Sequence, residues 1–354
     1  MAYTTINKST DYFNTKLYTG TGSTRSVTGV GFKPDFTWIK NRVKADSNHF
    51  LLDIVRGATK YLHSDADSSE TTNTNTLTSF DSDGFSLGDL DNVNKNNNTL
   101  VSWNWLAGGS QGSSNTAGSI NTTYTSVNTT AGFSISSYTG SGANATIGHG
   151  LGVTPNVVLV KCLSSTGNWK MHHTSLAPIT SLNLNDTSAQ ISTASVFNSM
   201  ATLNSNVFSV GTEGDTNSSG LTYVAYCFAE KQGYSKMGIY TGNGNPDGPF
   251  IYTGFAPAWV LCKSVSGSGS PGGNDWNLLD NKMTPYNMHV NKLFPNTSGV
   301  ENTSAEGTLD MVSNGFKPRG TGGSEKNNNS GTNYIYMAFG QSIVGTNGVT
   351  AKAR

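Results

Sequence analysis

Charged residues are scarce in this chain of 354 residues. Asp, Glu, Lys and Arg make up 12% of it, with 22 acidic and 22 basic side chains, so the formal net charge is zero. Proteins that bind nucleic acid present a basic surface to the phosphates, and a charge-poor, balanced sequence offers none. We therefore expect no nucleic-acid partner.

Cysteine and long apolar runs are rare as well. The three cysteines, Cys162, Cys227 and Cys262, are too few for a disulfide framework, and we interpret them as small buried apolar side chains. No apolar run reaches the roughly 18 residues of a membrane-spanning helix, so no membrane insertion is expected. The first residues lack a basic region followed by an apolar core, so no signal peptide is expected either.

Glycine and small polar residues dominate instead. The chain has 41 glycines and is rich in Ser, Thr and Asn, which are poor helix formers and favour turns and strand surfaces. Hydrophobic residues make up 35% of the chain, and it contains 15 Phe, 14 Tyr and 6 Trp, which is enough apolar mass for packed cores. The composition indicates a folded all-β protein.

One pattern occurs three times, about 100–120 residues apart, which is domain-sized and too long for a solenoid or propeller repeat. Each copy opens with Tyr-Thr-Gly, continues through a strand that begins near a proline, and closes with an aromatic strand. The openings are at 18–20, 138–140 and 240–242, the proline strands at 33–40, 154–161 and 256–263, and the closing strands at 100–107, 223–229 and 334–339. Short apolar or alternating segments between turn residues are typical of β-strands.

The repeat predicts three tandem antiparallel β-sandwich domains, jelly-roll-like, each with two sheets on an aromatic core. A Gly/Ser-rich stretch and a Thr/Asn-rich one separate the first two copies and are predicted to form a flexible or extended linker. The resulting boundaries are an N-terminal arm at 1–16, domains at 17–107, 132–232 and 233–342, a linker at 108–131, and a C-terminal tail at 343–354.

A candidate metal site precedes one short strand. Asp81 and Asp83 stand two residues apart beside Gly84, and such a loop offers carboxylate oxygens to Ca²⁺. The other two copies lack these acids, and a turn ahead of a strand accounts for Asp, Ser and Gly equally well. The turn is the favoured interpretation, and no cofactor is predicted.

Catalysis is not predicted. Asp53 and Asp280 end comparable apolar segments in the first and third copies, and paired carboxylates are typical of glycosidases. The second copy has no acid there, and the chain has no phosphate-binding loop and no nucleophile elbow. The six histidines, including the adjacent His172 and His173, show no metal-ligand spacing. We therefore predict that the protein is not an enzyme.

The most distinctive stretches are MAYTTINKSTDYFNTKLYTG at the start, FLLDIVRGATKYLHSDADSSE and VSWNWLAGG in the first copy, and the ending YVAYCFAE in the second. With these motifs the chain resembles a family of virion structural proteins of marine tailed phages, cyanophages and pelagiphages among them. The likeness is closest in the first copy. The resemblance carries no catalytic residues, and it implies a location in the phage particle.

The resemblance implies a tail-fibre-like or spike-like protein that binds the host surface, a glycan above all, through loops at the sandwich ends. The candidate loops are 263–275 and 319–333, with Asn274, Asp275 and Trp276 as candidate contacts. Trp169 and Trp276 offer rings that stack on sugars, although their repeated placement favours the core. The alternative is a capsid decoration or capsid-fibre protein that binds other virion proteins and has no receptor role.

The expected partners are other virion proteins, host surface polysaccharide and further copies of the chain. Fibres and spikes are commonly trimers, so a homo-trimer is favoured. Three copies of one pattern in a single chain offer another possibility, a pseudo-threefold unit built by one chain alone, and the sequence does not choose between them.

Overall fold

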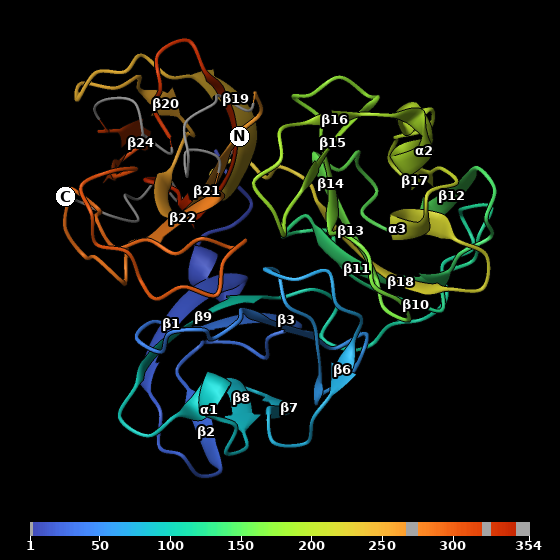
Figure 1. The fold of residues 1–354 in the computed structure, drawn as a ribbon, viewed down its shortest axis with the longest axis horizontal. Coiled ribbons are helices and arrows are strands. Elements are labelled where there is room, and N and C mark those ends of the chain that lie inside the picture. Colours follow the sequence, from blue (N-terminus) through green and yellow to red (C-terminus); the bar gives the residue numbers. More distant parts are fainter. Residues whose placement is uncertain (1–2, 267–274, 321–326, 345–354) are drawn as a thin grey trace.

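The computed structural model describes residues 3–266, 275–320 and 327–344. Strands and loops make up nearly all of this part of the chain, and its named strands pair antiparallel. The prediction of an all-β antiparallel fold is confirmed. Figure 1 shows three lobes around a common centre, which we call unit 1 (13–107), unit 2 (108–232) and unit 3 (233–342).

Unit 1 has a four-stranded sheet, β1-β9-β3-β4, and a three-stranded sheet, β2-β8-β7. Tyr18, Phe85 and Leu100 belong to the apolar cluster that the two sheets share. The elements of this unit, with the turn before it, are η1 (Ser9–Asp11), β1 (Phe13–Thr19), β2 (Arg25–Thr28), β3 (Phe36–Asn41), β4 (Phe50–Asp53), β5 (Lys60–Tyr61), β6 (Thr71–Thr72), β7 (Leu77–Asp81), β8 (Gly84–Leu87), α1 (Asp91–Asn94) and β9 (Thr99–Trp105).

Unit 2 repeats this plan with additions at both edges of the larger sheet. Its strand order is β10-β11-β18-β13-β14-β15-β16, and β12 pairs with β17 in the smaller sheet. The elements are β10 (Tyr124–Asn128), β11 (Phe133–Thr139), β12 (Ala145–Gly148), β13 (Val157–Cys162), β14 (Lys170–His173), β15 (Thr180–Asn183), β16 (Ile191–Ser192), α2 (Ala194–Phe197), η2 (Asn198–Met200), β17 (Val207–Val210), α3 (Gly214–Asn217) and β18 (Thr222–Phe228).

Unit 3 has the sheets β19-β25-β21-β22 and β20-β24-β23. Its elements are β19 (Ser235–Thr241), β20 (Ile251–Tyr252), β21 (Ala256–Ser264), β22 (Asn277–Asp280), β23 (Leu309–Val312), β24 (Gly315–Pro318) and β25 (Asn333–Gln341). In units 1 and 3 the first strand pairs with the last one, and in unit 2 the strand after β10, β11, pairs with the last one. Each last strand is the aromatic strand of the sequence pattern. The shared pairing means that equivalent residues of the three units can be identified by register.

The closing strands are buried on both faces, and this explains their continuous apolar character. In β9, Val101, Trp103 and Trp105 point toward the centre of the molecule, whereas Leu100 points into the cluster between the two sheets of unit 1. Successive side chains of a strand alternate between faces, so a strand between two cores needs apolar residues on both. β18 and β25 divide their residues in the same way.

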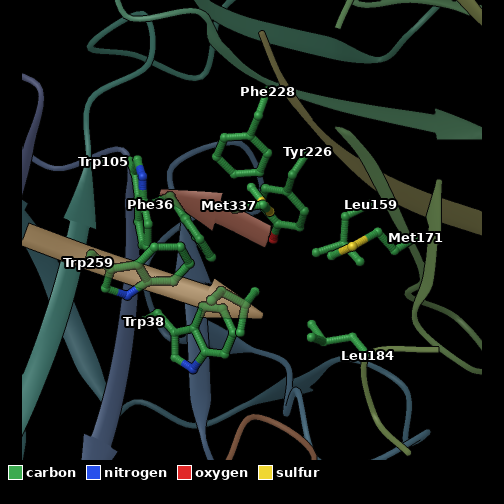
Figure 2. Close-up of a pocket in the computed structure, with 11 residues that line it drawn as sticks. Phe36, Trp38, Trp105, Leu159, Met171, Leu184, Tyr226, Phe228, Trp259 and Met337 are labelled. Carbon is green, nitrogen blue, oxygen red and sulfur yellow. The ribbon is translucent and has the colours of Figure 1, made fainter. Parts of the chain in front are cut away.

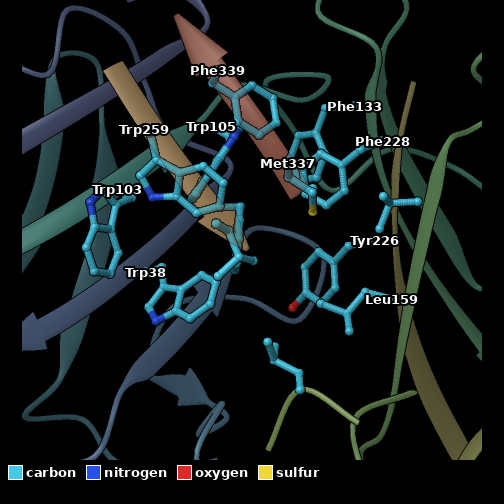
Figure 3. Close-up of a cluster of buried hydrophobic side chains, with 14 of the residues drawn as sticks. Trp38, Trp103, Trp105, Phe133, Leu159, Tyr226, Phe228, Trp259, Met337 and Phe339 are labelled. Atoms are coloured by element: carbon cyan, nitrogen blue, oxygen red, sulfur yellow. The ribbon is translucent and has the colours of Figure 1, made fainter. Parts of the chain in front are cut away.

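The inner faces of the three larger sheets share one core. Trp105, Phe228 and Phe339 occupy equivalent positions, and their ring centroids form a triangle with sides of 6.4, 5.9 and 5.8 Å. Figure 3 shows these rings from three different strands beside Trp259. Burial of each large aromatic side chain contributes about 1.5–3 kcal/mol, so this core binds the units together strongly. The three units form one body around a pseudo-threefold axis.

The segment 108–131 was expected to be a flexible or extended linker, and part of it is extended but paired in the sheet of unit 2. Its residues Tyr124–Asn128 form β10, which lies along the outer edge of β11 with Ser126 opposite Ile135. Asp35 of unit 1 accepts hydrogen bonds from the backbone N–H groups of Ala107 and Gly109, both at 2.7 Å. Composition suggested flexibility, but alternating Thr and Ser side chains also suit a strand whose backbone finds a partner.

The N-terminal arm is also shorter than the sequence suggested. β1 begins at Phe13, inside the expected arm of residues 1–16. The preceding residues pack on unit 3, where Tyr3 Oη donates to the Gly254 carbonyl at 2.9 Å and Gln341 Oε1 accepts from Ser9 N–H at 2.8 Å. This segment therefore links unit 1 to unit 3 through its own contacts.

Candidate functional site

The two carboxylates that suggested a glycosidase lie in different interfaces between units. Asp53 Oδ2 accepts a hydrogen bond of 2.6 Å from Tyr226 Oη of unit 2, and Asp280 Oδ2 accepts one of 2.8 Å from Trp103 Nε1 of unit 1. His173 takes the equivalent position in unit 2, and its Nε2 lies 3.3 Å from the Tyr336 carbonyl of unit 3. Each unit thus reaches the next one in a cyclic set of contacts.

The environment of these groups is that of a buried polar network. Asp53 and Asp280 are fully buried, and burial raises the pKa of Asp280. Asp53 also forms a buried ion pair with Arg56, which in turn lies 3.4 Å from Glu70. A buried charge is tolerated when it is paired and hydrogen-bonded. These carboxylates are occupied by structural partners, so nothing in the arrangement supports glycoside cleavage.

Trp169 and Trp276 are core residues, as their repeated placement favoured. Trp169 Nε1 donates to the His63 carbonyl of unit 1, and Trp276 Nε1 donates to the Asn183 carbonyl of unit 2, both at 2.8 Å. The hypothesis that Trp276 stacks on a sugar is therefore wrong, because its ring is 1% exposed.

Asp275, the residue before Trp276, also lacks the exposure that a ligand contact needs. It is buried, and it accepts a hydrogen bond of 2.8 Å from Asn296. Asn274 lies outside the described residues, as do parts of the expected ligand loops 263–275 and 319–333.

A set of three equivalent lysines was not singled out from the sequence. Lys40, Lys161 and Lys263 end the proline strands, all three are buried, and burial lowers the pKa of each to about 8. Lys40 Nζ donates to the Ser298 carbonyl of unit 3 and Lys161 Nζ to the Asp67 carbonyl of unit 1. The repeated lysine at the end of each proline strand was the sequence signal from which this set could have been found.

Asp81 and Asp83, the weak candidates for a metal site, hold a turn and a hairpin, as the favoured interpretation had it. Asp83 accepts hydrogen bonds from Gly29 N–H and Gly31 N–H at 2.9 and 2.7 Å, which lowers its pKa. Asp81 accepts from the hydroxyls of Ser79 and Ser86 at 2.7 Å. Among the described residues no group of three His, Cys, Asp or Glu side chains is placed to hold a metal ion. The turn interpretation accounts for every observed contact of the pair.

The three cysteines are buried thiols without disulfides. Cys162 and Cys227 lie together in the core of unit 2, and Cys262 in that of unit 3. Burial raises the pKa of Cys262 to about 12 and that of Cys227 further. A thiol with a raised pKa is a poor nucleophile and metal ligand. The interpretation of these residues as small apolar side chains fits their surroundings.

A small cavity lies in the shared core. It has a volume of about 20 Å³ and is lined by aromatic and apolar side chains of all three units, among them Phe36, Trp105, Tyr226, Trp259 and Met337 (Figure 2). A cavity needs roughly 10–15 Å³ to hold one water, and a water also needs polar partners. The space is thus a packing defect of the central core, too small for an organic ligand.

The most suitable ligand site is a surface hollow of about 600 Å³ on unit 3. Tyr286 stands at this hollow with 74% of its surface exposed, near Asn287, His289 and Ser313. Asn287 is fixed by two hydrogen bonds of 3.0 Å to the backbone of Met311. His289 is buried, its pKa is lowered by that burial, and its Nδ1 has no hydrogen-bond partner of standard geometry. An exposed ring beside fixed polar groups can bind a sugar.

Unit 3 also exposes more large apolar side chains than the other two units. Of the large hydrophobic residues that the described chain exposes, unit 3 carries Ile239, Phe250, Tyr252, Tyr286, Met288 and Val300, and units 1 and 2 carry only Val43, Tyr124, Val153 and Ile179. Sequence composition did not distinguish the three copies in this respect.

A family model described as a domain of unknown function, DUF7483, matches residues 8–342. The chain belongs to the DUF7483 family. The match runs through all three units, and Ser9 and Gln341, which join units 3 and 1, lie just inside its limits. The DUF7483 domain is therefore the whole three-unit body.

No curated protein and no solved structure matches the chain. Every helix among the described residues is too short or too polar to cross a membrane.

Proposed function

We propose that this chain is a non-enzymatic structural protein of a phage particle, tail-fibre-like or spike-like, that binds a host surface glycan through unit 3. The sequence resemblance to marine phage virion proteins supports the location. The observation that carries the binding role is the 74% exposed ring of Tyr286 at a hollow of about 600 Å³. Sugars present an apolar face for an aromatic ring and hydroxyls for fixed polar groups.

The polar lining of this hollow suits a neutral ligand. Asn281, Asn287, His289 and Ser313 provide amide, imidazole and hydroxyl groups, and among the described residues of the lining only Lys282 is charged. Recognition by one ring and several neutral polar groups is typical of sugar binding, whereas a phosphate or nucleic acid selects clustered positive charge. The hollow thus favours a neutral or weakly acidic polysaccharide.

The binding test uses the full chain, an array of bacterial glycans and purified lipopolysaccharide from a marine cyanobacterium. We expect binding that Tyr286→Ala abolishes and that Tyr252→Ala preserves, since Tyr252 is 59% exposed on unit 3 but does not line the hollow. Absence of glycan binding by the wild-type chain, or equal loss in both variants, contradicts the proposal.

A capsid decoration or capsid-fibre role is the second candidate. The exposed apolar side chains of unit 3 favour it, because they suit contact with another virion protein. Cryo-electron microscopy of the intact particle separates the two roles. An outward position at the tail periphery supports receptor binding, whereas a position on the capsid lattice supports decoration. The expected homo-oligomer, with a trimer favoured, stays a prediction, and the mass of the purified chain in solution tests it.

We also infer that each unit is a modified jelly roll. In unit 1 the first strand pairs with the last and the second with the penultimate, as β1 with β9 and β2 with β8. Units 2 and 3 show the same nested pairing. Nested pairs of this kind support jelly-roll-like connectivity. The hairpin β3–β4, which keeps two consecutive strands in one sheet, is the modification.

A further inference from the structure

A second hollow lies at the junction of units 3 and 1. It has a volume of about 450 Å³. Three consecutive residues of β1, Phe13, Asn14 and Thr15, line it together with residues 7–10 of the N-terminal segment and with Ala258, Asn281, Lys282 and Gln341 of unit 3. Successive side chains of a strand point to opposite faces, so three in a row line a space only if it runs along the strand's edge. β1 is an edge strand of its sheet.

The equivalent edge in unit 2 is occupied by the chain itself. β10 pairs antiparallel with β11, and Ser126 stands opposite Ile135, the counterpart of Thr15. Gln111, in the segment that leads to β10, donates through Nε2 to the Val55 carbonyl at 2.7 Å, and Val55 is the counterpart of Lys282. A strand with its flanking segment therefore fills the junction between units 1 and 2.

The junction between units 2 and 3 is closed by a side chain. Met237 is the counterpart of Thr15 and Ile135 in unit 3, and its N–H donates to Glu230 Oε1 at 2.8 Å. Glu230 also forms an ion pair of 3.0 Å with Lys236. A carboxylate thus takes the place of a paired strand on the edge of β19. The described part of the chain supplies neither a strand nor a carboxylate beside Thr15.

Two buried polar atoms at the open junction lack partners. Thr15 is 6% exposed and its Oγ1 has no hydrogen bond, and Asn281 Oδ1, in the lining of the same hollow, has none either. A buried polar atom left unsatisfied costs about 1–3 kcal/mol. Since one water occupies roughly 30 Å³ in the liquid, the hollow is too large for a single bridging water. The site has the volume and the unpaired groups of a binding site.

We propose that this hollow is the docking site for an extended strand of another protein chain, which pairs antiparallel with the outer edge of β1. The geometry is that of β10 on β11, so the fitting segment has small polar and β-branched side chains, as in Tyr124–Asn128. Lys282 places a positive charge in this lining, where its counterpart in unit 1, Val55, is apolar. Among the described residues no acidic side chain forms an ion pair with Lys282. The partner strand is therefore neutral or acidic.

The test uses a fluorescent synthetic peptide with the sequence of residues 111–128 and the full chain. The Gly20 N–H donates to the Asn98 carbonyl, and the even-numbered residues of β1 share its orientation, so their N–H and C=O groups face β9. The N–H and C=O groups of the odd-numbered residues therefore point away from β9, to the open edge. Proline at position 17 therefore removes an outward N–H without breaking the ladder to β9. Ile239→Pro is the matched control, since Ile239 is the counterpart of Leu17 on β19.

We expect saturable binding of the peptide to the wild-type chain, at least about tenfold weaker binding to Leu17→Pro, and unchanged binding to Ile239→Pro, because an edge proline removes a ladder hydrogen bond. Hydrogen exchange of the wild-type chain gives a readout that needs no variant. The amides of Thr15 and Leu17 are expected to exchange more slowly when the peptide is bound. Absence of binding at millimolar peptide, unchanged exchange of these amides, or equal loss in both proline variants overturns the proposal.

Discussion

Tyr226 of unit 2 donates a hydrogen bond of 2.6 Å to Asp53 of unit 1, and both side chains are fully buried. The contact joins the closing strand of one unit to the end of β4 in another. Because Asp53 also pairs with Arg56, one carboxylate neutralises a buried cation and fixes an interface. The interface is therefore sensitive to small changes at either residue.

Removing the hydroxyl group of Tyr226 should destabilise the whole molecule. Tyr226→Phe loses a hydrogen bond to a charged acceptor, and we expect the free energy of unfolding to fall by about 1.5–3 kcal/mol. Asp53→Ala leaves Arg56 buried without its partner, and we expect a larger loss of about 3–5 kcal/mol. Urea denaturation measures both, with Tyr124→Phe at a half-exposed site as the control. Equal stability of Tyr226→Phe and the wild type would contradict the role of this contact.

Substitutions of Trp276 and Tyr286 in unit 3 should affect stability and glycan binding separately. Trp276→Phe loses the 2.8 Å hydrogen bond to the Asn183 carbonyl, and we expect a loss of about 1–3 kcal/mol of stability with glycan binding retained below the unfolding temperature. Tyr286→Ala should do the reverse, because its ring is 74% exposed. Thermal unfolding and glycan binding of both variants provide the check. A Trp276→Phe variant that is stable but binds no glycan would restore the sugar-stacking hypothesis.

The buried lysines predict a gain of stability in mild alkali. The pKa of Lys40, Lys161 and Lys263 is about 8 in the folded chain, against an ordinary value of 10.5. Between these values the unfolded chain binds more protons than the folded one, so the free energy of unfolding rises with pH. The rise begins near pH 8. Above about pH 10 the buried tyrosines oppose this rise in the free energy of unfolding. Burial raises the pKa of Tyr234, for example, so its hydroxyl stays protonated in the folded chain at a pH where it ionises in the unfolded chain.

Denaturant unfolding between pH 7 and 9.5 measures this slope. Lys161→Met should reduce the slope, since it removes one of three titrating groups. Lys95→Met serves as the control, because Lys95 is 44% exposed in a surface ion pair with Asp91. Stability that is constant or falls between pH 8 and 9.5 would show that these lysines stay charged in the folded chain.

The shared core predicts that the units do not fold separately. A piece spanning residues 108–232 would expose Phe133, Tyr226 and Phe228, which the complete chain buries in the central cluster. Large exposed apolar patches lead to association, so we expect this piece to aggregate. The full chain should unfold in one calorimetric transition. A soluble, monomeric 108–232 piece with its own cooperative transition would show that the units are independent domains.

Much of the fold could be predicted from local patterns. The strands and their threefold repetition were identified by the apolar character of β9, β18 and β25, by the prolines just before β3 and β13 and at the start of β21, and by the glycines between strands. The repeated position of Trp169 and Trp276 correctly favoured the core. Such signals are local, because strand period and turn chemistry depend on residues close in sequence.

The errors concern contacts between distant segments. Residues 108–131 have the composition of a linker, yet β10 forms there because the edge of β11 offers it a hydrogen-bonding partner. Asp275 was placed in a surface loop by composition, but it is buried, next to Trp276, whose indole donates a hydrogen bond to Asn183 of unit 2. The hollow beside Tyr286 combines residues from 256 to 343, which no local pattern connects.

Local patterns were enough to predict an all-β chain with three copies of one strand pattern, because side-chain period, turn residues and composition act over a few residues at a time. The shared core around Trp105, Phe228 and Phe339, and the contacts of Asp53, His173 and Asp280 between neighbouring units, depend on long-range packing. The tertiary structure also decided which of three equivalent edges, those of β1, β11 and β19, remains open. These outcomes depend on how sheet faces and edges meet, and residues more than a hundred positions apart determine that geometry together.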